Sequence, residues 1–315
     1  MASYSMLRRK LAKKTLLDMY QNSLSQVPNL GPNNVWHVNA DISGGDGKSW
    51  DSAFDTMTEA IDACSDGDTV LLAGTLTEHI DYGSYAAGPD RISILGVGIG
   101  LLDPTWLQVL LGTSTSDMID LQCHGWTFDN IRFRGPKGYD IFKLDMPTSA
   151  GGAMGTTIKN CWFRRPNVDS GASYGINVLG PYDCRIINNN FMIAGTGAAI
   201  GVDGQGFSFP NGTTVAYNRF YECGNQIDVP YINSFILYNT FQGTGHENTT
   251  TKHLDLSGGH DNTVFGNSFG GDYSTASGSY VAGSGDNWIG NWAEDVAETT
   301  EVDASTGMTK AIPAS

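Results

Sequence analysis

Arg185-Ile186-Ile187-Asn188-Asn189-Asn190-Phe191 is one of six copies of a short unit that returns along the chain. Each copy is a β-type run, a tight turn, a second run and a closing Phe. The closing residues follow one another at intervals of 21 to 30 residues. A period of this size predicts a solenoid, in which each unit stacks on the one before it. The six are Phe133, Phe163, Phe191, Phe220, Phe241 and Phe269.

A second, alternating strand is predicted upstream of each of these runs. In Gly175-Ile176-Asn177-Val178, two apolar side chains face one way and a polar side chain faces the other. The units show no helical period, which a leucine-rich or ankyrin-type repeat would need. The sequence therefore predicts an all-β fold, a parallel β-helix. The corresponding runs are Met118–Leu121, Tyr139–Phe142, Ala199–Val202, Gln226–Val229 and His253–Leu256.

The repeated Phe and Asn residues are interpreted as structural. In stacked coils, equivalent positions lie ~4.8 Å apart. Phe on Phe would build an inward aromatic stack, while Asn tolerates the left-handed backbone of a tight corner and bonds to the amides above and below. We therefore predict a structural ladder rather than a binding site. Its members are Asn130, Asn160, Asn189, Phe133, Phe163, Phe191, Phe220, Phe241 and Phe269.

A helix is predicted to cap the first coil. Ser52 to Cys64 has an amphipathic pattern, with Met57, Ala60, Ile61 and Cys64 on one face. Thr56 and Glu59 have the spacing of a capping box. A solenoid needs such a cover because its first coil would otherwise expose a strand edge and part of the core.

This segment carries a family resemblance. The runs Trp36–Asn39, Gly44–Phe54, Thr58–Ala63 and Gly67–Glu78 resemble the first segment of right-handed parallel β-helix repeat proteins, the pectate-lyase-like superfamily. The resemblance covers residues 35–292 and implies a right-handed β-helix with an N-terminal cap. It implies little about function, because that superfamily includes pectin-degrading enzymes, surface adhesins, phage tailspikes and phage head-decoration proteins.

Composition narrows the classes of partner and compartment. The formal net charge of −15 predicts repulsion of nucleic acid. The five cysteines are an odd number without a CxxC pair, so no disulfide framework is predicted and assembly in a reducing compartment is favoured. No stretch approaches the ~18 apolar residues of a membrane span.

The first residues differ from the rest. Residues 1–14 contain five basic residues and no acid, which leaves −20 on the remainder of the chain. We divide the chain into a basic amphipathic arm and linker (1–34), a β-helix with its cap (35–292) and a C-terminal tail (293–315). The arm would form a short docking helix that binds a larger assembly, lies on a membrane, or packs against the first coil. Its interface residues would be Leu7, Arg8, Arg9, Lys10, Leu11, Lys13, Lys14, Leu17 and Tyr20.

The arm and the absence of an export signal favour a phage virion protein. Phage virion proteins resemble this arrangement of a short anchoring segment before a β-helix, and they are often trimers. The first interpretation is a capsid decoration (cement) protein on the virion surface. It would be assembled in the host cytoplasm and bind the phage major capsid protein or another virion protein, without a membrane or nucleic-acid partner. The alternative is a tailspike-like or free enzyme that binds or degrades polysaccharide.

An enzyme would use the polar face of the upstream strands. Alignment places Asp120, Asn177, Gly201, Asp228 and Asp255 at one outward position. Asp228 and Asp255 would lie on successive coils, and we expect His253 to share their face. Such a trio suits general acid–base catalysis, and two close carboxylates suit Ca²⁺. The alternative is a row of solvated residues, so no catalytic residue, metal site or cofactor is assigned.

The sequence also leaves a glycan partner open. Rings that would stack on sugars are Tyr139, Trp162, Tyr174, Tyr182, Tyr231 and Tyr238. The pectate-lyase pattern, which groups Ca²⁺-binding acids with a catalytic Arg on one face, is not matched. The arginines instead lie within the runs that close on Asn and Phe or at the ends of these runs, as Arg132, Arg164, Arg165, Arg185 and Arg219.

Overall fold

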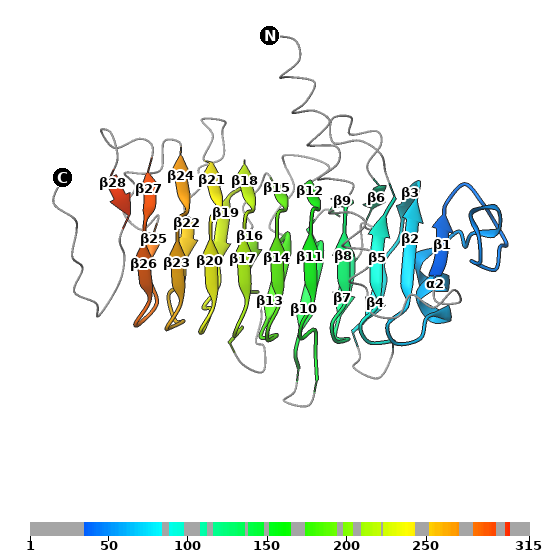
Figure 1. The fold of residues 1–315 in the computed structure, drawn as a ribbon, viewed down its shortest axis with the longest axis horizontal. Helices are drawn as coiled ribbons and strands as arrows, with labels where there is room; N and C mark the ends of the chain where they lie inside the picture. Colours follow the sequence, from blue (N-terminus) through cyan, green and yellow to red (C-terminus); the bar gives the residue numbers. More distant parts are fainter. Residues whose placement is uncertain are drawn as a thin grey trace, which may run out of the picture.

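A computed structural model places the chain in a single stack of coils (Figure 1). It describes residues 35–83, 88–97, 108–111, 116–135, 138–147, 151–164, 174–193, 198–203, 209–221, 223–242, 252–270, 280–293 and 300–302. The proposed arm (1–34) and most of the C-terminal tail lie outside the described residues. Three sheets run the length of the stack and form a right-handed parallel β-helix. Within the described residues, no helix is long and apolar enough to cross a membrane.

Sheet A contains the first run of each repeat, and all of its strand pairs are parallel. Its strands are β1 (Val35–Asn39), β2 (Thr69–Ala73), β5 (Ser93–Gly96), β8 (Thr127–Asp129), β11 (Thr157–Lys159), β14 (Arg185–Ile187), β17 (Thr214–Ala216), β20 (Phe235–Leu237), β23 (Thr263–Phe265) and β26 (Asn287–Ile289).

Sheet B contains the second runs that close on Phe, and only its last pair, β27 with β28, is antiparallel among the described strands. Its strands are β3 (Thr75–Thr77), β6 (Gln108–Leu111), β9 (Ile131–Arg134), β12 (Trp162–Arg164), β15 (Asn190–Met192), β18 (Arg219–Tyr221), β21 (Thr240–Gln242), β24 (Ser268–Gly270), β27 (Asn291–Ala293) and β28 (Thr300–Val302).

Sheet C contains the alternating upstream strands and is parallel throughout its described pairs. Its strands are β4 (Ile80–Tyr82), β7 (Ile119–Leu121), β10 (Phe142–Asp145), β13 (Ile176–Leu179), β16 (Ala198–Gly201), β19 (Asn225–Asp228), β22 (Lys252–Asp255) and β25 (Tyr280–Val281). One strand from each sheet makes a coil, so side chains of one kind meet along the stack.

The predicted Phe stack is confirmed. Phe163 and Phe191 stack with ring centroids 4.5 Å apart, and the stack continues to Phe220 at 4.9 Å. Phe241 and Phe269 extend it at 4.9 and 4.8 Å with nearly parallel rings. All of these rings are buried, because their strands face the interior of the solenoid.

The prediction that Asn130, Asn160 and Asn189 share one column is wrong. Asn130 and Asn160 have positive φ and stack with Asn188 at the corner, where the Asn188 side-chain amide donates to Asn160 at 2.7 Å. Asn189 instead begins the next column, a buried ladder. The two roles that we assigned to one Asn, a left-handed corner and an amide ladder, belong to neighbouring residues. The buried ladder consists of Asn189, Asn218, Asn239, Asn267 and Asn291.

The predicted cap is present but shorter. A 3₁₀ turn, η1 (Trp50–Ser52), precedes the helix α2 (Met57–Ala63), so the expected start at Ser52 is wrong. The helix begins where Thr56 accepts a hydrogen bond from the Glu59 amide at 3.2 Å. Met57, Ala60 and Ile61 are buried against the first coil, while Cys64 follows the helix as its C-cap.

Replacing Glu78 with Ala is expected to destabilise this cap by about 1–2 kcal/mol. The Glu78 carboxylate accepts hydrogen bonds from the Met57 and Thr58 amides, each at 2.8 Å, at the positive end of the helix. Urea unfolding measures the loss. Glu59→Ala removes a carboxylate from the same turn without those bonds and is the matched control. Equal losses in the two variants would contradict the capping role.

All five cysteines lie in the described residues, and all are free thiols, as expected. Cys123, Cys161, Cys184 and Cys223 are buried, and Cys64 packs at the edge of the core. Burial raises the pKa of Cys123 to about 11 and of Cys184 to about 12. They therefore act as small apolar side chains rather than as thiolate nucleophiles.

Candidate functional site

The outer face of sheet C carries one column of mostly polar residues. Strand pairing places Asp120, Asn177, Gly201, Asp228 and Asp255 in register, which confirms the predicted alignment. The structure adds two residues that the alignment missed. Asp81 extends the column before Asp120, and Lys143 lies between Asp120 and Asn177. Lys143 was missed because β10 starts at Phe142, three residues after the start of the predicted run Tyr139–Phe142.

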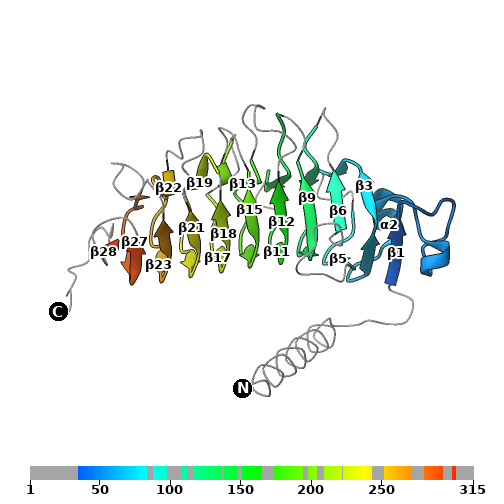
Figure 2. The same cartoon turned by 90° about the horizontal axis from the view of Figure 1, so that it is seen from above.

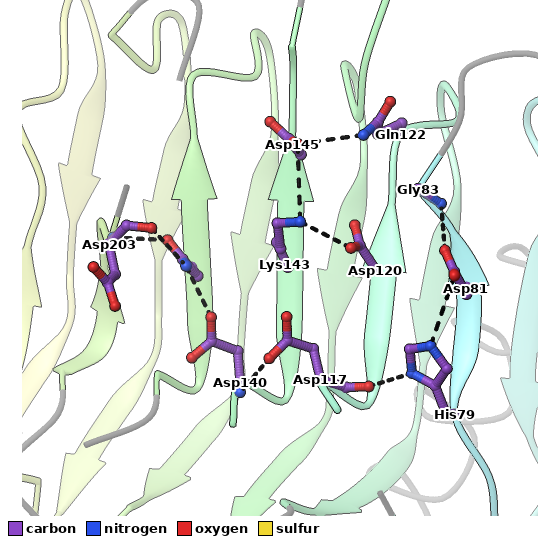
Figure 3. Close-up of polar contacts among 11 residues, drawn as sticks. His79, Asp81, Gly83, Asp117, Asp120, Gln122, Asp140, Lys143, Asp145 and Asp203 are labelled. Carbon is purple, nitrogen blue, oxygen red and sulfur yellow. Dashed lines mark hydrogen bonds and ion pairs between the residues drawn. The ribbon is translucent and has the colours of Figure 1, made fainter. Parts of the chain in front are cut away.

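Lys143 lies between two carboxylates (Figure 3). Its Nζ is 2.8 Å from Asp120 Oδ2 and 4.0 Å from Asp145 Oδ2, and Gln122 donates to Asp145 at 3.3 Å. Burial disfavours its charge, but the hydrogen bond and charge of Asp120 outweigh burial and raise the pKa of Lys143. Burial also raises the pKa of Asp145, against the opposing charge of Lys143. Lys143 is therefore held as a cation and is poorly suited to act as a base.

Asp140 lies beside this ion pair and is held by three hydrogen bonds. Its carboxylate accepts from the Tyr174 amide and from the Asn177 side chain, both at 2.8 Å, and its own amide donates to Asp117 at 2.9 Å. Burial raises the pKa of Asp140 to about 6, more than these hydrogen bonds lower it. A carboxyl group with a pKa of about 6 is partly protonated in mildly acidic solution, which is the property that a general acid needs.

Asn177 and His79 hydrogen-bond to the neighbours of Asp140. Asn177 accepts a hydrogen bond from the Asp203 amide at 3.0 Å, next to the bond that it donates to Asp140. His79 contacts the Asp117 carbonyl through Nδ1, and its Nε2 is 3.9 Å from Asp81. The face therefore combines one carboxyl group whose pKa is raised to about 6 with further carboxyl groups and the cation Lys143.

The predicted trio of Asp228, Asp255 and His253 comes together only in part. Asp228 and Asp255 are direct neighbours on β19 and β22. Asp228 accepts from the Asn225 side chain at 3.2 Å, and Asp255 accepts from the Ser257 amide at 2.8 Å. Both carboxylates thus have local structural hydrogen bonds.

The expectation that His253 shares the outward face of Asp255 is wrong. His253 is buried, and its ring centroid lies 5.8 Å from that of Phe269. His253, Leu254 and Asp255 are consecutive residues of β22, and all three are buried. The matching residues of other coils, such as Ile141 and Ala199, are buried and apolar, so strict alternation fails at this position. Its Nδ1 is 2.6 Å from Gln226 Oε1.

The acids of the described residues do not form a metal site. No three His, Cys, Asp or Glu side chains in that part of the chain are arranged to hold an ion. The neighbouring Asp228 and Asp255 would supply only two ligand groups, whereas Ca²⁺ takes six to eight oxygen ligands. We therefore assign no residue here to Ca²⁺.

The aromatic residues named for glycan contact lie on different faces. Trp162 is on sheet B, Tyr238 is at the corner after sheet A, and Tyr174 lies over Gly201 on sheet C. Tyr231 is buried in the core. Trp162, Tyr139 and Tyr238 are 36–46% exposed. No single aromatic surface is formed by this set.

Acidification is expected to change the stability of the fold through His253 and Asp140, with opposite signs for the two groups. Burial lowers the pKa of His253 to about 4, so the unfolded chain binds more protons between pH 6.5 and 4, and stability falls as pH falls. The folded pKa of Asp140 is raised to about 6, so the folded chain binds more protons between pH 4 and 6. The stability that the protonated Asp140 carboxyl group contributes is therefore lost as the pH rises through 6. Each group changes stability by roughly 3 kcal/mol.

Asp140→Asn should therefore lose more stability than the unsubstituted chain between pH 6 and pH 4. His253→Gln should lose less over the same range. Urea midpoints at four pH values between 4 and 7 measure both slopes. Parallel pH profiles for the three proteins would contradict the assignment.

Comparison with known proteins concerns the fold. No family model and no curated protein matches the chain. Similar solved structures include pectate lyase Pel9A, with 14% identity, 82% of this chain and 73% of that chain covered, and a TM-score of 0.47. The Dettilon tailspike protein has 13% identity, 73% and 54% coverage and a TM-score of 0.38. A mannuronic acid specific polysaccharide family 6 lyase from human gut microbiota has 15% identity, 75% and 61% coverage and a TM-score of 0.42.

Proposed function

We propose that the chain is a structural protein of a phage virion, a capsid decoration protein that binds the shell through its N-terminal region and projects a rigid β-helix. The observation that carries the proposal is the division of charge. Five basic residues lie within residues 1–14, and the remainder of the chain carries −20. Such a basic segment suits binding to another protein surface, while the acidic body suits exposure to solvent.

The attachment point of the basic segment supports end-on binding. Residue 34 continues into β1, the terminal strand of sheet A, next to the helix α2. The coils extend from there in one direction (Figure 1). The stacked Phe rings and the buried Asn ladder connect each coil to the next, which makes the rod stiff. A segment that binds at this end would leave the far coils away from the shell.

The partner we propose is the major capsid protein of a phage or another virion protein. In this proposal the chain acts as a homo-trimer on the virion surface. Neither assignment depends on the polar face of sheet C.

Charge reversal in the full-length chain tests the proposal. Arg8, Arg9, Lys10, Lys13 and Lys14 are replaced together by Glu, and binding to purified phage capsids stripped of accessory proteins is followed by co-sedimentation. Binding should fall at least about tenfold and should weaken with salt in the unsubstituted chain. The control reverses Lys159 and Arg185, which lie on sheet A. Equal binding by all three proteins would overturn the proposal.

A second candidate function is supported by the raised pKa of Asp140. A carboxyl group with a raised pKa beside further carboxyl groups is an arrangement that a glycoside hydrolase uses. In this alternative the chain is a tailspike-like or free polysaccharide-degrading enzyme. A reducing-end assay over neutral and acidic polysaccharides tests it, with Asp140→Asn expected to abolish any activity. Activity that survives this substitution would remove Asp140 from the mechanism.

A further inference from the structure

The corner where strands of sheet A continue into strands of sheet B runs along one side of the rod (Figure 2). On seven successive coils, a single residue with φ between 52° and 66° makes this turn. Asn and Gly adopt a left-handed backbone most readily, and five of the seven coils use them. The other two coils use tyrosine. In chain order the seven residues are Asn130, Asn160, Asn188, Tyr217, Tyr238, Gly266 and Gly290.

Tyr217 and Tyr238 occupy positions that disfavour a bulky side chain, because the Cβ atom crowds the backbone when φ is positive. Burial does not offset this strain, since Tyr217 is 59% exposed and Tyr238 is 46% exposed. A strained residue at the surface indicates a role other than stability. We call Tyr217 and Tyr238 the aromatic corner and treat it as a candidate binding site.

The two rings of the aromatic corner are held in place by their neighbours along the rod. Their centroids are 5.3 Å apart, and their planes differ by 12°. Tyr238 also meets the Phe265 ring edge to face, with centroids 5.3 Å apart. Gly266 leaves the space that the Tyr238 ring occupies, because a Cβ atom on Gly266 would lie 2.7 Å from two carbons of that ring. Rings that are already fixed lose little freedom when a ligand binds.

A hydrogen-bond acceptor lies beside the first ring. The corner amides of the earlier coils form a chain of hydrogen bonds, in which Asn160 donates to Asp129 and Asn188 donates to Asn160, each at 2.7 Å. The chain ends at Asn188, because the next corner residue is Tyr217. Asn188 is exposed, and its side-chain oxygen accepts no hydrogen bond from the described part of the chain. That oxygen can therefore accept a hydrogen bond from a ligand hydroxyl beside Tyr217.

Sheet A is uncharged around the aromatic corner, although the chain carries −15. Its earlier coils present Asp129, Lys159 and Arg185, whereas the strands β17, β20, β23 and β26 contain no charged residue. On sheet B, Arg219 already donates to Gln242 at 3.0 Å. Exposed rings, an amide acceptor and no charge on this part of sheet A suit a neutral ligand that carries both apolar groups and hydroxyl groups.

We propose that the aromatic corner binds an uncharged polysaccharide that lies along the rod, with sugar units against Tyr217 and Tyr238 and a hydroxyl that donates to Asn188. A sugar ring presents apolar C–H groups and hydroxyls together, which match the ring and the phenol group of an exposed tyrosine. Successive coils are ~4.8 Å apart, close to the length of one sugar unit in an extended chain, so successive units can meet successive coils. The site does not rest on the virion role, because it lies on the side of the rod and not at the end next to α2.

Calorimetric titration of the full-length chain with soluble polysaccharides tests the site. The probes are dextran, galactomannan, xyloglucan and, as an anionic comparison, polygalacturonate. At least one neutral polymer should bind, and its affinity should be unchanged in about 0.5 M salt, because no charge takes part. Tyr217→Asn with Tyr238→Asn should weaken this binding at least ~tenfold. The control Phe235→Thr removes an exposed ring from the start of β20, copies Thr214 and Thr263 of the adjacent coils, and should leave binding unchanged.

Urea unfolding of the same double variant separates a binding role from a structural role. Three other coils use Asn at this corner, so Tyr217→Asn with Tyr238→Asn should leave the unfolding midpoint unchanged or raise it. A lower midpoint together with lost binding would assign the rings to the fold and overturn the proposal.

Three further results would overturn the proposal. The first is that none of the neutral polymers binds, and the second is that only polygalacturonate binds. The third is a mass by light scattering that falls in the double variant of a chain that binds no polymer, because the aromatic corner would then be a contact between copies. Since none of these experiments contains capsids, their outcome is independent of the virion proposal.

Discussion

Asn239→Leu is expected to destabilise the solenoid by roughly 3–6 kcal/mol, although the two side chains are similar in size. Asn239 is buried, and its side chain makes bonds to two neighbouring coils. It accepts from the Asn218 backbone and side-chain amides at 2.9 and 3.0 Å. It donates to the Val215 carbonyl at 2.9 Å and to Asn267 at 3.0 Å. Leu would leave these buried polar groups without partners in a place that water does not reach.

Asn160→Gly is the matched control for the ladder. Asn160 also bonds to the coils on either side, to Asp129 and Asn188, but it is exposed and its φ is 56°. Gly accepts that backbone, and water replaces the lost bonds, so the expected change is below about 1 kcal/mol. Urea unfolding followed by circular dichroism compares the two variants. Similar losses would mean that the ladder is not stabilised by its burial.

The sequence was sufficient to predict the fold because each repeat in the sequence corresponds to one coil of the structure. Each coil needs an inward aromatic at the same place, and the steps between Phe133 and Phe269 report where each coil closes. Alternation on sheet C was equally informative about register, since Asp120, Asp228 and Asp255 share one column of the sheet as expected. The handedness was taken from the resemblance of the first segment.

The repeat pattern could not resolve a shift of one residue in the alignment of the Asn columns. The run Asn188-Asn189-Asn190 satisfies either alignment of the Asn columns, so sequence could not separate the corner from the ladder. The separation follows from φ values and burial, which sort Asn188 from Asn189. In the coil before, Cys161 takes the ladder position, and its backbone amide donates the hydrogen bond that marks this position to the Asn189 side-chain oxygen at 2.9 Å.

The candidate site was harder to predict for a related reason. Tyr139-Asp140-Ile141-Phe142 alternates as well as the true strand does, which hid Lys143 from the column and Asp140 from the site. His253 was misplaced because strict alternation was assumed in β22, where His253, Leu254 and Asp255 are all buried. A comparison with the other coils would have placed both Lys143 and His253 correctly. In those coils, the apolar residues Ile141 and Ala199 occupy the position of His253. The basic arm stays a prediction, because its residues lie outside those described.

Phe220→Ala is expected to cost about 3–5 kcal/mol, the other large effect in this molecule. The ring is fully buried between Phe191 and Phe241, at 4.9 Å from each, and the neighbouring strands cannot close the gap without breaking register. The loss of stability should at first be confined to the coils around Phe220. Because each coil contacts only its neighbours, a defect in a central coil uncouples the two halves of the rod.

Hydrogen exchange measures that uncoupling, and Phe235→Ala provides the contrast. Phe235 is two strands further along the chain, on β20 of sheet A, but is 46% exposed, so its removal should cost below about 1 kcal/mol. In Phe220→Ala, amides of β15, β18 and β21 should exchange faster than those near α2, where the cap still holds the first coil. Uniform acceleration along the whole rod would show that the solenoid unfolds as one unit, because the opening would then not be confined to the coils that lost their ring.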